Sequence, residues 1–449
     1  MKKKFIYVLT LSFFILASGF IILKYKNDAS KNESQLFELL PAKGNYSQMP
    51  EWKQSKDLVD GLISKIEANP KDLKSLNNLT ATYLQEARNS GNFSYYDNAA
   101  MHCVNKILEI DPKNFEGLTF KATIFMSQHH FTDGLNLAKE IVKLYPYSAF
   151  VYGILVDANV ELGNYSDAVD AAEKMISLRP DLRSYSRISY LREIHGDING
   201  AIEAMKLAVD AGSPGTESTE WTRVQLGKLY EQKGELQFAK MNYAIALQNR
   251  PGYPYALAGM GRIALSENKL TQAIDYFSKA DSVSNDYTFK EALVEIHKLN
   301  GEAAVAKSLA DDIIKEMEKA AEISLKDPAA GHYADREMAI AYLAVDNYDK
   351  ALEHALLEYN RRPNNIDVNE TLAWVYYMKK DFGNAVSYIT PALKTNCRNP
   401  VLLCHAGLIY FKAGDKLAAK NYLQQALKDH PNIPQDLLIQ MQNTLKSIN

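Results

Sequence analysis

The sequence contains little cysteine, proline and glycine. Its 449 residues include 3 cysteines, 22 glycines and 15 prolines. Three cysteines are too few to build a disulfide-stabilised fold. Glycine and proline together make up about 8% of the chain, against roughly 12% in average proteins. Because turn-dense β folds need more of both, this scarcity disfavours an all-β architecture and favours helices.

The chain also lacks an excess of charge of either sign. Lys and Arg number 51 and Asp and Glu number 54, for a net charge of −3 at pH 7. Proteins that bind nucleic acid usually carry a basic stripe or patch, so we expect no nucleic acid partner. With 47% hydrophobic and 23% charged residues, the composition is that of a globular chain and not of a disordered one.

A long hydrophobic run without charges occupies residues 5–23. As a helix it spans about 28 Å, close to the hydrocarbon thickness of a bilayer. We therefore predict a transmembrane anchor or a signal sequence there. A cleaved signal would use the small residues 17–19 as its cleavage site, which leaves the apolar residues 20–23 at the mature N-terminus. An uncleaved anchor uses the whole run and is the preferred interpretation.

The charges around this run predict its orientation. Three lysines lie in residues 1–4, whereas Asp28 partly offsets Lys24 and Lys26 behind the run. By the positive-inside rule, residues 1–4 form a cytoplasmic basic segment and the rest of the chain lies outside the cytoplasm, in a periplasm or an extracellular space. Cleavage would release the same chain as a secreted protein. Residues 24–50 are polar without a clear period and are predicted to form a tether.

The most informative feature of the sequence is an internal repeat. Four prolines follow one another at intervals of 34 residues, and two later ones lie 68 residues apart: Pro112, Pro146, Pro180 and Pro214, then Pro363 and Pro431. A recurring pattern fills the intervals. Its clearest copy has Leu226, Gly227, Tyr230, Ala239, Tyr243, Ala246 and Pro251.

The spacing of this pattern indicates a pair of packed helices. Leu, Gly and Tyr at i, i+1 and i+4 lie on one stripe of a first helix, and Ala and an aromatic residue lie on one face of a second. The small residue lets the two helices approach closely, and proline ends the second helix. The pattern closely resembles the tetratricopeptide repeat family over about four-fifths of the chain, from about Asp72 to Pro431. The resemblance implies an all-α, right-handed solenoid of about ten helical hairpins, preceded by one N-terminal transmembrane or signal helix.

The repeat also divides the chain into predicted parts. Residues 51–71 form a leading helix before the tetratricopeptide-like repeats of 72–285. In residues 286–328 the pattern degrades, and we expect a divergent repeat with a long helix. Repeats resume over 329–431, and a capping helix follows at 432–449.

In the family that this chain resembles, the first helix of each copy lines a concave groove. The corresponding positions are rich in aromatic residues and arginine, which are enriched in interface hot spots. The resemblance thus implies a partner-binding groove made of Tyr190, Trp221, Tyr255, Arg262, Tyr333, Arg336, Trp374, Tyr377 and Phe411. Alternatively, several of these aromatic residues fill gaps between neighbouring copies.

No motif predicts catalysis, a cofactor or a metal site. Residues 259–264 superficially match a dinucleotide fingerprint, but both glycines fall inside a repeat helix. His129 and His130 have no third ligand spaced nearby and are interpreted as surface histidines between two helices. Cys397 and Cys404 are seven residues apart, and either a disulfide or two buried thiols is compatible with that spacing.

We therefore expect a non-catalytic scaffold or adaptor that binds a protein or peptide in its groove and reaches the membrane through its N-terminal helix. Two alternatives are a subunit that recruits substrate for a separate enzyme, and a glycan-binding protein outside the cytoplasm. The first agrees with the absence of space for a fused catalytic domain, and the second with the ability of aromatic grooves to stack on sugars. The sequence leaves the partner and the oligomeric state open.

Overall fold

The protein is helical throughout its described part. The computed structural model describes residues 36–326, 331–428 and 431–448, which contain one short 3-10 helix, η1 (Gly44–Gln48), 22 α-helices and no β-strand. The predicted anchor at residues 5–23, the basic residues 1–4 and the first part of the predicted tether lie outside the described residues. Within the described ranges, no helix combines the length and the apolar character needed to cross a membrane.

In the described part of the chain, ten helical hairpins follow one another, as the repeat predicts, between the helix α2 (Pro50–Ala68) and the helix α23 (Gln435–Ile448). The hairpins pair α3 (Leu73–Ser90) with α4 (Phe93–Ile110), α5 (Phe115–Ser127) with α6 (Phe131–Leu144), α7 (Ala149–Glu161) with α8 (Tyr165–Leu178), α9 (Leu182–Ile194) with α10 (Ile198–Asp210), α11 (Glu217–Gln232) with α12 (Leu236–Asn249), α13 (Pro254–Ser266) with α14 (Leu270–Val283), α15 (Tyr287–Leu299) with α16 (Ala303–Lys326), α17 (Asp335–Ala344) with α18 (Tyr348–Arg361), α19 (Ile366–Met378) with α20 (Phe382–Ala392), and α21 (Pro400–Lys412) with α22 (Lys416–Leu427).

Each hairpin turn contains one residue in the left-handed region of φ. Six turns use glycine, whose missing Cβ permits this conformation, and the other four use His129, Asn268, Asp346 and Lys380. The repeat prolines lie just after the second helices, as expected from their missing N–H group: Pro112, for example, follows α4, which ends at Ile110. The chain therefore reverses at a left-handed residue within each hairpin and changes direction at or near proline between several hairpins.

The small residues of the pattern let the paired helices approach closely. A Cβ atom placed on Gly227 or Gly259 would lie 2.4 or 2.7 Å from the ring of Tyr243, and one on Gly261 would lie 2.6 Å from the ring of Phe277. Tyr243 is fully buried between the helices. Gly259 and Gly261 are thus packing residues of α13, which explains their dinucleotide-like spacing without a nucleotide.

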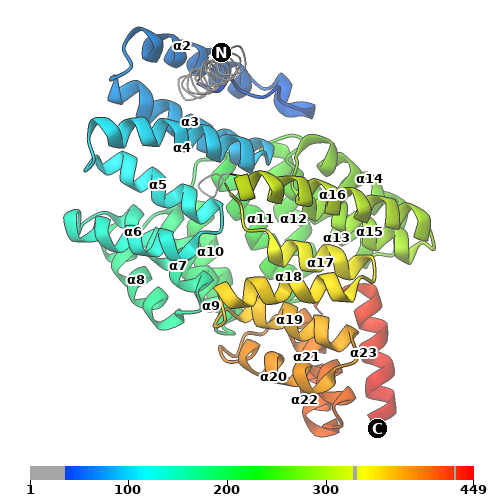
Figure 1. The fold of residues 1–449 in the computed structure, drawn as a ribbon. Helices are drawn as coiled ribbons and strands as arrows, with labels where there is room; N and C mark the ends of the chain where they lie inside the picture. The colour runs from blue at the N-terminus through cyan, green and yellow to red at the C-terminus, as the bar shows by residue number, and fades with distance from the viewer. Residues whose placement is uncertain (1–35, 327–330, 429–430, 449) are drawn as a thin grey trace, which may run out of the picture.

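The hairpins wind into a superhelix whose successive turns touch. Hydrogen bonds between side chains or main chains join residues that lie 193 to 205 positions apart, which is about six repeats. Asn285 contacts Asn92, Tyr333 N–H donates to the Gln128 carbonyl, Asn365 donates to the Glu161 carbonyl, and Asn432 donates to the Glu231 carboxylate. We call this line of contacts the seam. Figure 1 shows the later hairpins α17–α22 lying below α11–α16, with α2 and α23 at opposite ends of the molecule.

Candidate functional site

The first helices of the hairpins lie closer to the superhelix axis than the second helices. First helices of consecutive hairpins, such as α11 and α13 or α17 and α19, contact one another more closely than the second helices do. In a curved stack the elements at the smaller radius are the ones that crowd together. The side chains that project from the first helices toward the axis therefore form a concave surface, which we call the inner surface.

Charged and aromatic groups on the inner surface influence one another across several hairpins. The charge of Asp367 in α19 acts to raise the pKa of Tyr190 and of Glu193 in α9. The charge of Arg262 in α13 acts to lower the pKa of Lys228 in α11, and that of Glu193 acts to raise it. Arg336 of α17 is surrounded by carboxylates of three first helices. The residues linked in this way are Glu161, Tyr190, Glu193, Lys228, Arg262, Arg336, Asp367 and Glu370.

These groups are accessible and desolvated at once. Tyr190 keeps 39% of its surface exposed, yet burial, followed by Asp367 and Glu161, raises its pKa well above the usual value. Burial likewise raises the pKa of Glu193 and of Asp367, although both side chains are only half-buried. Protein that surrounds a side chain without covering it is the arrangement expected on the wall of a narrow concave space.

Lys228 is a half-buried cation on the first helix α11. Its ammonium group forms no hydrogen bond or ion pair with any described residue. The two charges with the largest effect on it, Arg262 and Glu231, pair with each other. Burial and the charge of Arg262 lower the pKa of Lys228 to about 8. A desolvated, unpaired ammonium group on an accessible surface is a candidate contact for an anionic or carbonyl group of a ligand.

Arg262, which the sequence suggests as a partner-binding residue, is instead used within the chain. Its guanidinium contacts the Glu231 carboxylate with N–O distances of 2.9 to 3.1 Å, and it lies 3.1 Å from the Tyr243 hydroxyl. Asn432 of the next superhelical turn donates to the same carboxylate at 3.0 Å. Arg262 therefore helps to join the two turns, and its ion pair would have to break before it could bind a partner.

Arg336 keeps more of its binding capacity. Its Nε donates to the Thr371 hydroxyl at 3.1 Å, and it forms no ion pair within 4 Å in the described part of the chain. Burial acts to lower its pKa, but Asp367, Glu337 and Glu370 outweigh this and raise it. Arg336 is thus a fixed positive charge among carboxylates.

Trp374 and Tyr377 form an aromatic stack at the C-terminal part of the inner surface. The Trp374 ring lies 4.6 Å from that of Tyr377 and 3.8 Å from that of His405, in both cases nearly parallel. His405 in turn lies 2.9 Å from Glu370. Burial acts to raise the pKa of Glu370, but the contact with His405 leaves it below the usual value.

The remaining residues suggested by the repeat do not join this set. Trp221 and Tyr255 are half-buried against the core around α11 and α13, and Tyr255 packs 5.5 Å from Tyr253 and 5.6 Å from Phe289. Phe411 is half-buried on α21. Tyr333 lies at the seam, where its ring stacks 4.3 Å from that of His130. The alternative that some of these aromatic residues fill gaps between copies agrees with Trp221 and Tyr255.

The interpretation of the two histidines as surface residues is wrong for His130, which is buried, whereas His129 is half-buried. A ring nitrogen of each lies 2.8 Å from a backbone carbonyl oxygen, that of Tyr333 for His129 and that of Gly331 for His130, and His130 is buried. Both histidines are part of the seam. The sequence could not show this because their partners come from about 200 residues further along the chain.

The described residues show no assembled chemical centre. No three of their His, Cys, Asp or Glu side chains lie in an arrangement suited to a metal ion. All three cysteines are buried and unpaired, so Cys397 and Cys404 do not form a disulfide. Burial raises the pKa of each thiol to about 12, which makes them unreactive at neutral pH.

Sequence reasoning missed several charged residues of the inner surface, among them Lys228, Asp367 and Glu370. The repeat register contains the signal that would have found two of them. Lys228 lies one 34-residue period before Arg262, and Glu370 lies one period after Arg336. Aligning charges as well as aromatic residues by that period would have placed both on the same face.

Comparison with known proteins agrees with this architecture. Residues 401–428, which span α21 and α22, match the family model of the tetratricopeptide repeat. Over 184 residues the chain is 26% identical to small glutamine-rich tetratricopeptide repeat-containing protein 2 of Saccharomyces cerevisiae, an alignment that covers 40% of this chain and 52% of that relative. The chain thus matches only about half the length of this curated relative.

Solved structures with a similar helical arrangement are also found. The APC/C hetero-tetramer Cut9-Hcn1 aligns with a TM-score of 0.44 and 17% identity over 86% of this chain and 60% of that one. The human IFIT1 dimer with PPP-AAAA aligns with a TM-score of 0.42 and 16% identity over 67% of this chain and 69% of that one. Both TM-scores are low, so the fold assignment rests on the repeat itself.

The fold and its inner surface define an all-α superhelical repeat protein. Its ten described hairpins have the arrangement of tetratricopeptide repeats, and residues 401–428 match the model of that repeat.

Proposed function

We propose that this chain is a non-catalytic scaffold or adaptor that binds an extended segment of a protein partner along its inner surface. The proposal is based on one observation: the inner surface has side chains that are partly exposed, surrounded by protein and not bonded to other side chains. Tyr190 is 39% exposed, and neither the Lys228 ammonium group nor the Asp367 carboxylate bonds to a described side chain. Groups in this state have their bonding capacity left for a ligand.

The charges suggest how a partner would bind. Lys228 and Arg336 would pair with carboxylates or backbone carbonyls, and Asp367 and Glu193 with basic side chains or N–H groups. Tyr190 would supply apolar contact area with a polar tip. Lys228 takes the role that the sequence suggests for Arg262, since the Arg262 guanidinium is already bound to Glu231. Superhelical repeats offer extended concave surfaces suited to such a segment.

The two alternatives differ in their support. A subunit that recruits substrate for a separate enzyme would use the same surface in the same way, and only the identity of the partner distinguishes it. Binding of a glycan needs open aromatic faces, but Trp374 already stacks on His405 and Tyr377. This contact makes a protein partner the better-supported ligand.

We further propose that the array works outside the cytoplasm, held by a membrane helix at residues 5–23. The support is the uncharged apolar run preceded by the lysines of residues 1–4.

A cross-linked pull-down from membranes tests the binding surface. We compare the wild-type chain with a Tyr190→Ser, Lys228→Gln double variant and with Tyr147→Ser as the matched control. Tyr147 is 81% exposed and lies in the loop between α6 and α7, away from the inner surface. All three must show equal helical signal.

We expect the double variant to lose recovery of a specific protein by at least about tenfold, since two central contacts are removed. The control should retain that recovery. Equal recovery by the double variant, or equal loss in the control, would contradict the proposal.

A further inference from the structure

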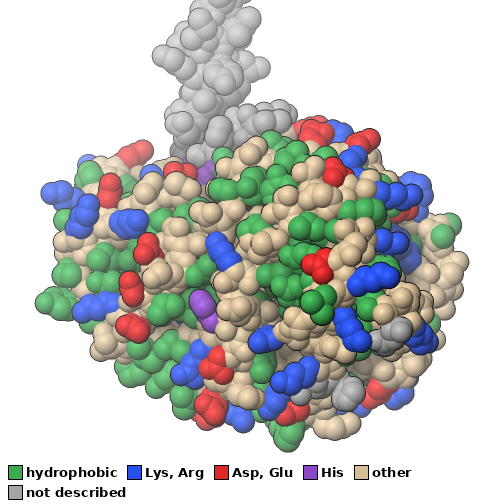
Figure 2. Space-filling view, turned by 90° about the horizontal axis from the view of Figure 1, so that it is seen from below, with side chains coloured by type: hydrophobic (Ala, Val, Ile, Leu, Met, Phe, Trp, Pro, Cys, Tyr) green, Lys and Arg blue, Asp and Glu red, His purple; other side chains and the backbone are tan. Residues whose placement is uncertain are grey.

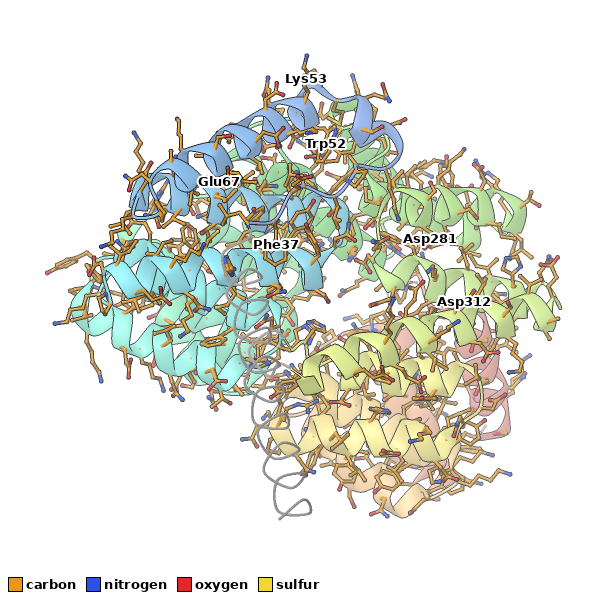
Figure 3. All side chains as sticks on the ribbon, turned by 45° about the horizontal axis from the view of Figure 1, so that its top comes forward. Phe37, Trp52, Lys53, Glu67, Asp281 and Asp312 are labelled. Atoms are coloured by element: carbon orange, nitrogen blue, oxygen red, sulfur yellow. The ribbon has the colours of Figure 1, made fainter. Side chains whose placement is uncertain are left out.

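The second half of the predicted tether is packed against the first hairpin. Residues 36–43, which we call the strap, form no helix and lead into η1. The strap carries two pairs of large apolar residues around one glutamate, Leu36-Phe37 and Leu39-Leu40 around Glu38. All four apolar side chains pack against the core formed mainly by α2, α3 and α4. Figure 3 shows Phe37 lying over this hairpin, with Trp52 near the start of α2.

Three tyrosine hydroxyls of the hairpin bind the backbone of the strap. Tyr83 donates to the carbonyl of Phe37, and Tyr95 donates to the carbonyl of Glu38 at 2.7 Å. The backbone N–H of Leu40 donates to the Tyr96 hydroxyl at 3.0 Å. These bonds hold the main chain in an extended path and do not depend on which side chains the strap carries. Recognition of an extended segment through its main chain is a common mode of peptide binding.

The tyrosines are positioned by the hairpin itself. Tyr83 and Tyr96 are fully buried and stack with their ring centroids 6.2 Å apart, and Tyr95 packs edge-on against Tyr96 at 5.1 Å. In contrast, the four apolar residues of the strap are only half-buried, and Glu38 is exposed. The strap therefore lies on a surface built by α3 and α4, and it contributes less to the core than the residues beneath it. We call Tyr83, Tyr95 and Tyr96 the tyrosine platform.

We propose that the tyrosine platform is a second peptide-binding site, separate from the inner surface, which the strap occupies in cis. Its ligand is an extended segment of another protein with large apolar residues spaced like Leu36, Phe37, Leu39 and Leu40. Such a segment binds by displacing the strap. The strap can be replaced because its side chains are only half-buried and because the tyrosines bond to its main chain. Many sequences with similarly spaced apolar residues can make the same contacts.

The tether makes this replacement competitive. A segment of the same chain, held near its site by η1 and α2, acts as if present at a high concentration, on the order of millimolar. A free peptide of micromolar affinity thus binds the wild-type chain poorly and binds well only once the strap is disabled. The site is regulated by the chain's own strap.

The test uses the full chain with Phe37→Asp and Leu40→Asp, which weaken the strap and leave the platform unchanged. The probe is a fluorescein-labelled peptide of residues 34–43, followed by fluorescence anisotropy. Equal helical signal in the wild-type and variant chains shows that the hairpins remain folded. We expect saturable micromolar binding to the variant, at least tenfold weaker binding to the wild type, and no binding of a peptide with the same two aspartates.

Two further variants locate the site. Adding Tyr95→Phe to the strap variant removes the hydroxyl that bonds to Glu38, and we expect it to weaken peptide binding about three- to tenfold. Adding Tyr190→Ser, on the inner surface, should leave peptide binding unchanged, so failure of this proposal is distinguishable from failure of the proposed function.

Four results would overturn the inference. A folded strap variant that does not bind the peptide shows that the strap is only structural. Equal binding by wild type and variant, or no effect of Tyr95→Phe, places the peptide elsewhere. Formation of a dimer by the strap variant together with the wild-type chain, seen by sedimentation, assigns the platform to a second copy of this chain.

Discussion

The fold leaves the Lys228 ammonium group without an ion pair among the described residues, although the charges of Glu231, Asp286 and Glu193 act on it. Glu231 is occupied by Arg262, and Glu193 accepts a hydrogen bond from Gln232 at 2.6 Å. The pKa of Lys228 is about 8 in the folded chain, compared with 10.5 for an ordinary lysine. The charged form of Lys228 is therefore less stable in the folded chain than in the unfolded chain, which reduces the free energy of unfolding. Such a reduction is expected for a charged group that bonds to a ligand and not within the chain.

This shift predicts how stability depends on pH. Below pH 8 the lysine is charged in both the folded and the unfolded chain, and it lowers the free energy of unfolding by its full amount. Between pH 8 and 10.5 the unfolded chain binds more protons than the folded chain, so stability gained from this group rises with pH until the cost is gone.

Replacement of Lys228 by methionine should therefore stabilise the protein at pH 7 by about 1 kcal/mol, a figure reduced for the partial exposure of the side chain. The gain should shrink from pH 8 upward. Urea unfolding at a series of pH values measures it, with Lys139→Met on the exposed face of α6 as the control. A constant difference across this pH range would show that the charge of Lys228 is not the cause.

At the same scale, the sequence identifies packing residues better than charged ones. Gly261 is predicted to be the small residue of a helix pair, and its close approach to Phe277 confirms this. The role of Arg262 was not predictable, because Asn432, which donates to the Arg262 carbonyl and to the Glu231 carboxylate, lies 170 residues from Arg262 and 201 residues from Glu231. A local sequence pattern predicts packing within a hairpin, whereas the partners of a charged residue depend on which distant residues the superhelix places next to it.

Among the elements, α13 depends on a missing side chain. A Cβ on Gly261 would lie 2.6 Å from the Phe277 ring, whereas one on Gly61, in the helix α2, would meet nothing within 4 Å. Both glycines lie inside helices, where glycine is less favourable than alanine by roughly 0.5–1 kcal/mol.

Alanine should consequently have opposite effects at the two sites. We expect Gly261→Ala to destabilise the protein by about 1–3 kcal/mol through overpacking. Gly61→Ala should stabilise it by up to about 1 kcal/mol, if α2 unfolds together with the hairpins. Thermal unfolding of both variants measures this, and stabilisation by Gly261→Ala would mean that α13 and α14 are not in close contact.

The helical hairpins themselves were predictable, because each copy carries its own turn and packing signals. The strap was not: residues 24–50 have no period, and the packing of Leu36 to Leu40 depends on the tyrosines of α3 and α4. An extended segment that binds through its backbone leaves little pattern in its own sequence.

For the whole molecule, the defining feature is the seam between the two superhelical turns. It could not be predicted from the repeat, because the number of hairpins per turn depends on small rotations between neighbours. The long separation of about 200 residues between its partners leaves no local signal. Figure 2 shows positively and negatively charged side chains interspersed over one end of the molecule. This surface distribution of charge does not reveal the seam either.

The seam predicts a specific cross-link. Asn92 and Asn285 are in side-chain contact although 193 residues apart. In an Asn92→Cys, Asn285→Cys variant, a short bis-maleimide should link the two positions in the folded chain and change its mobility on a denaturing gel. Each single variant should show no such product, because the three native cysteines are buried. Absence of the product in the folded double variant would mean that the turns are apart.

The most direct test of the account asks which face a partner touches. A photo-cross-linking residue is placed at Tyr190 on α9, at Arg336 on α17, or at the exposed Tyr147 as the outer control. If an extended segment lies along the inner surface, the same partner should be captured from Tyr190 and from Arg336 and not from Tyr147. Capture from Tyr147 alone, or of different proteins from the two inner positions, would contradict binding along the inner surface.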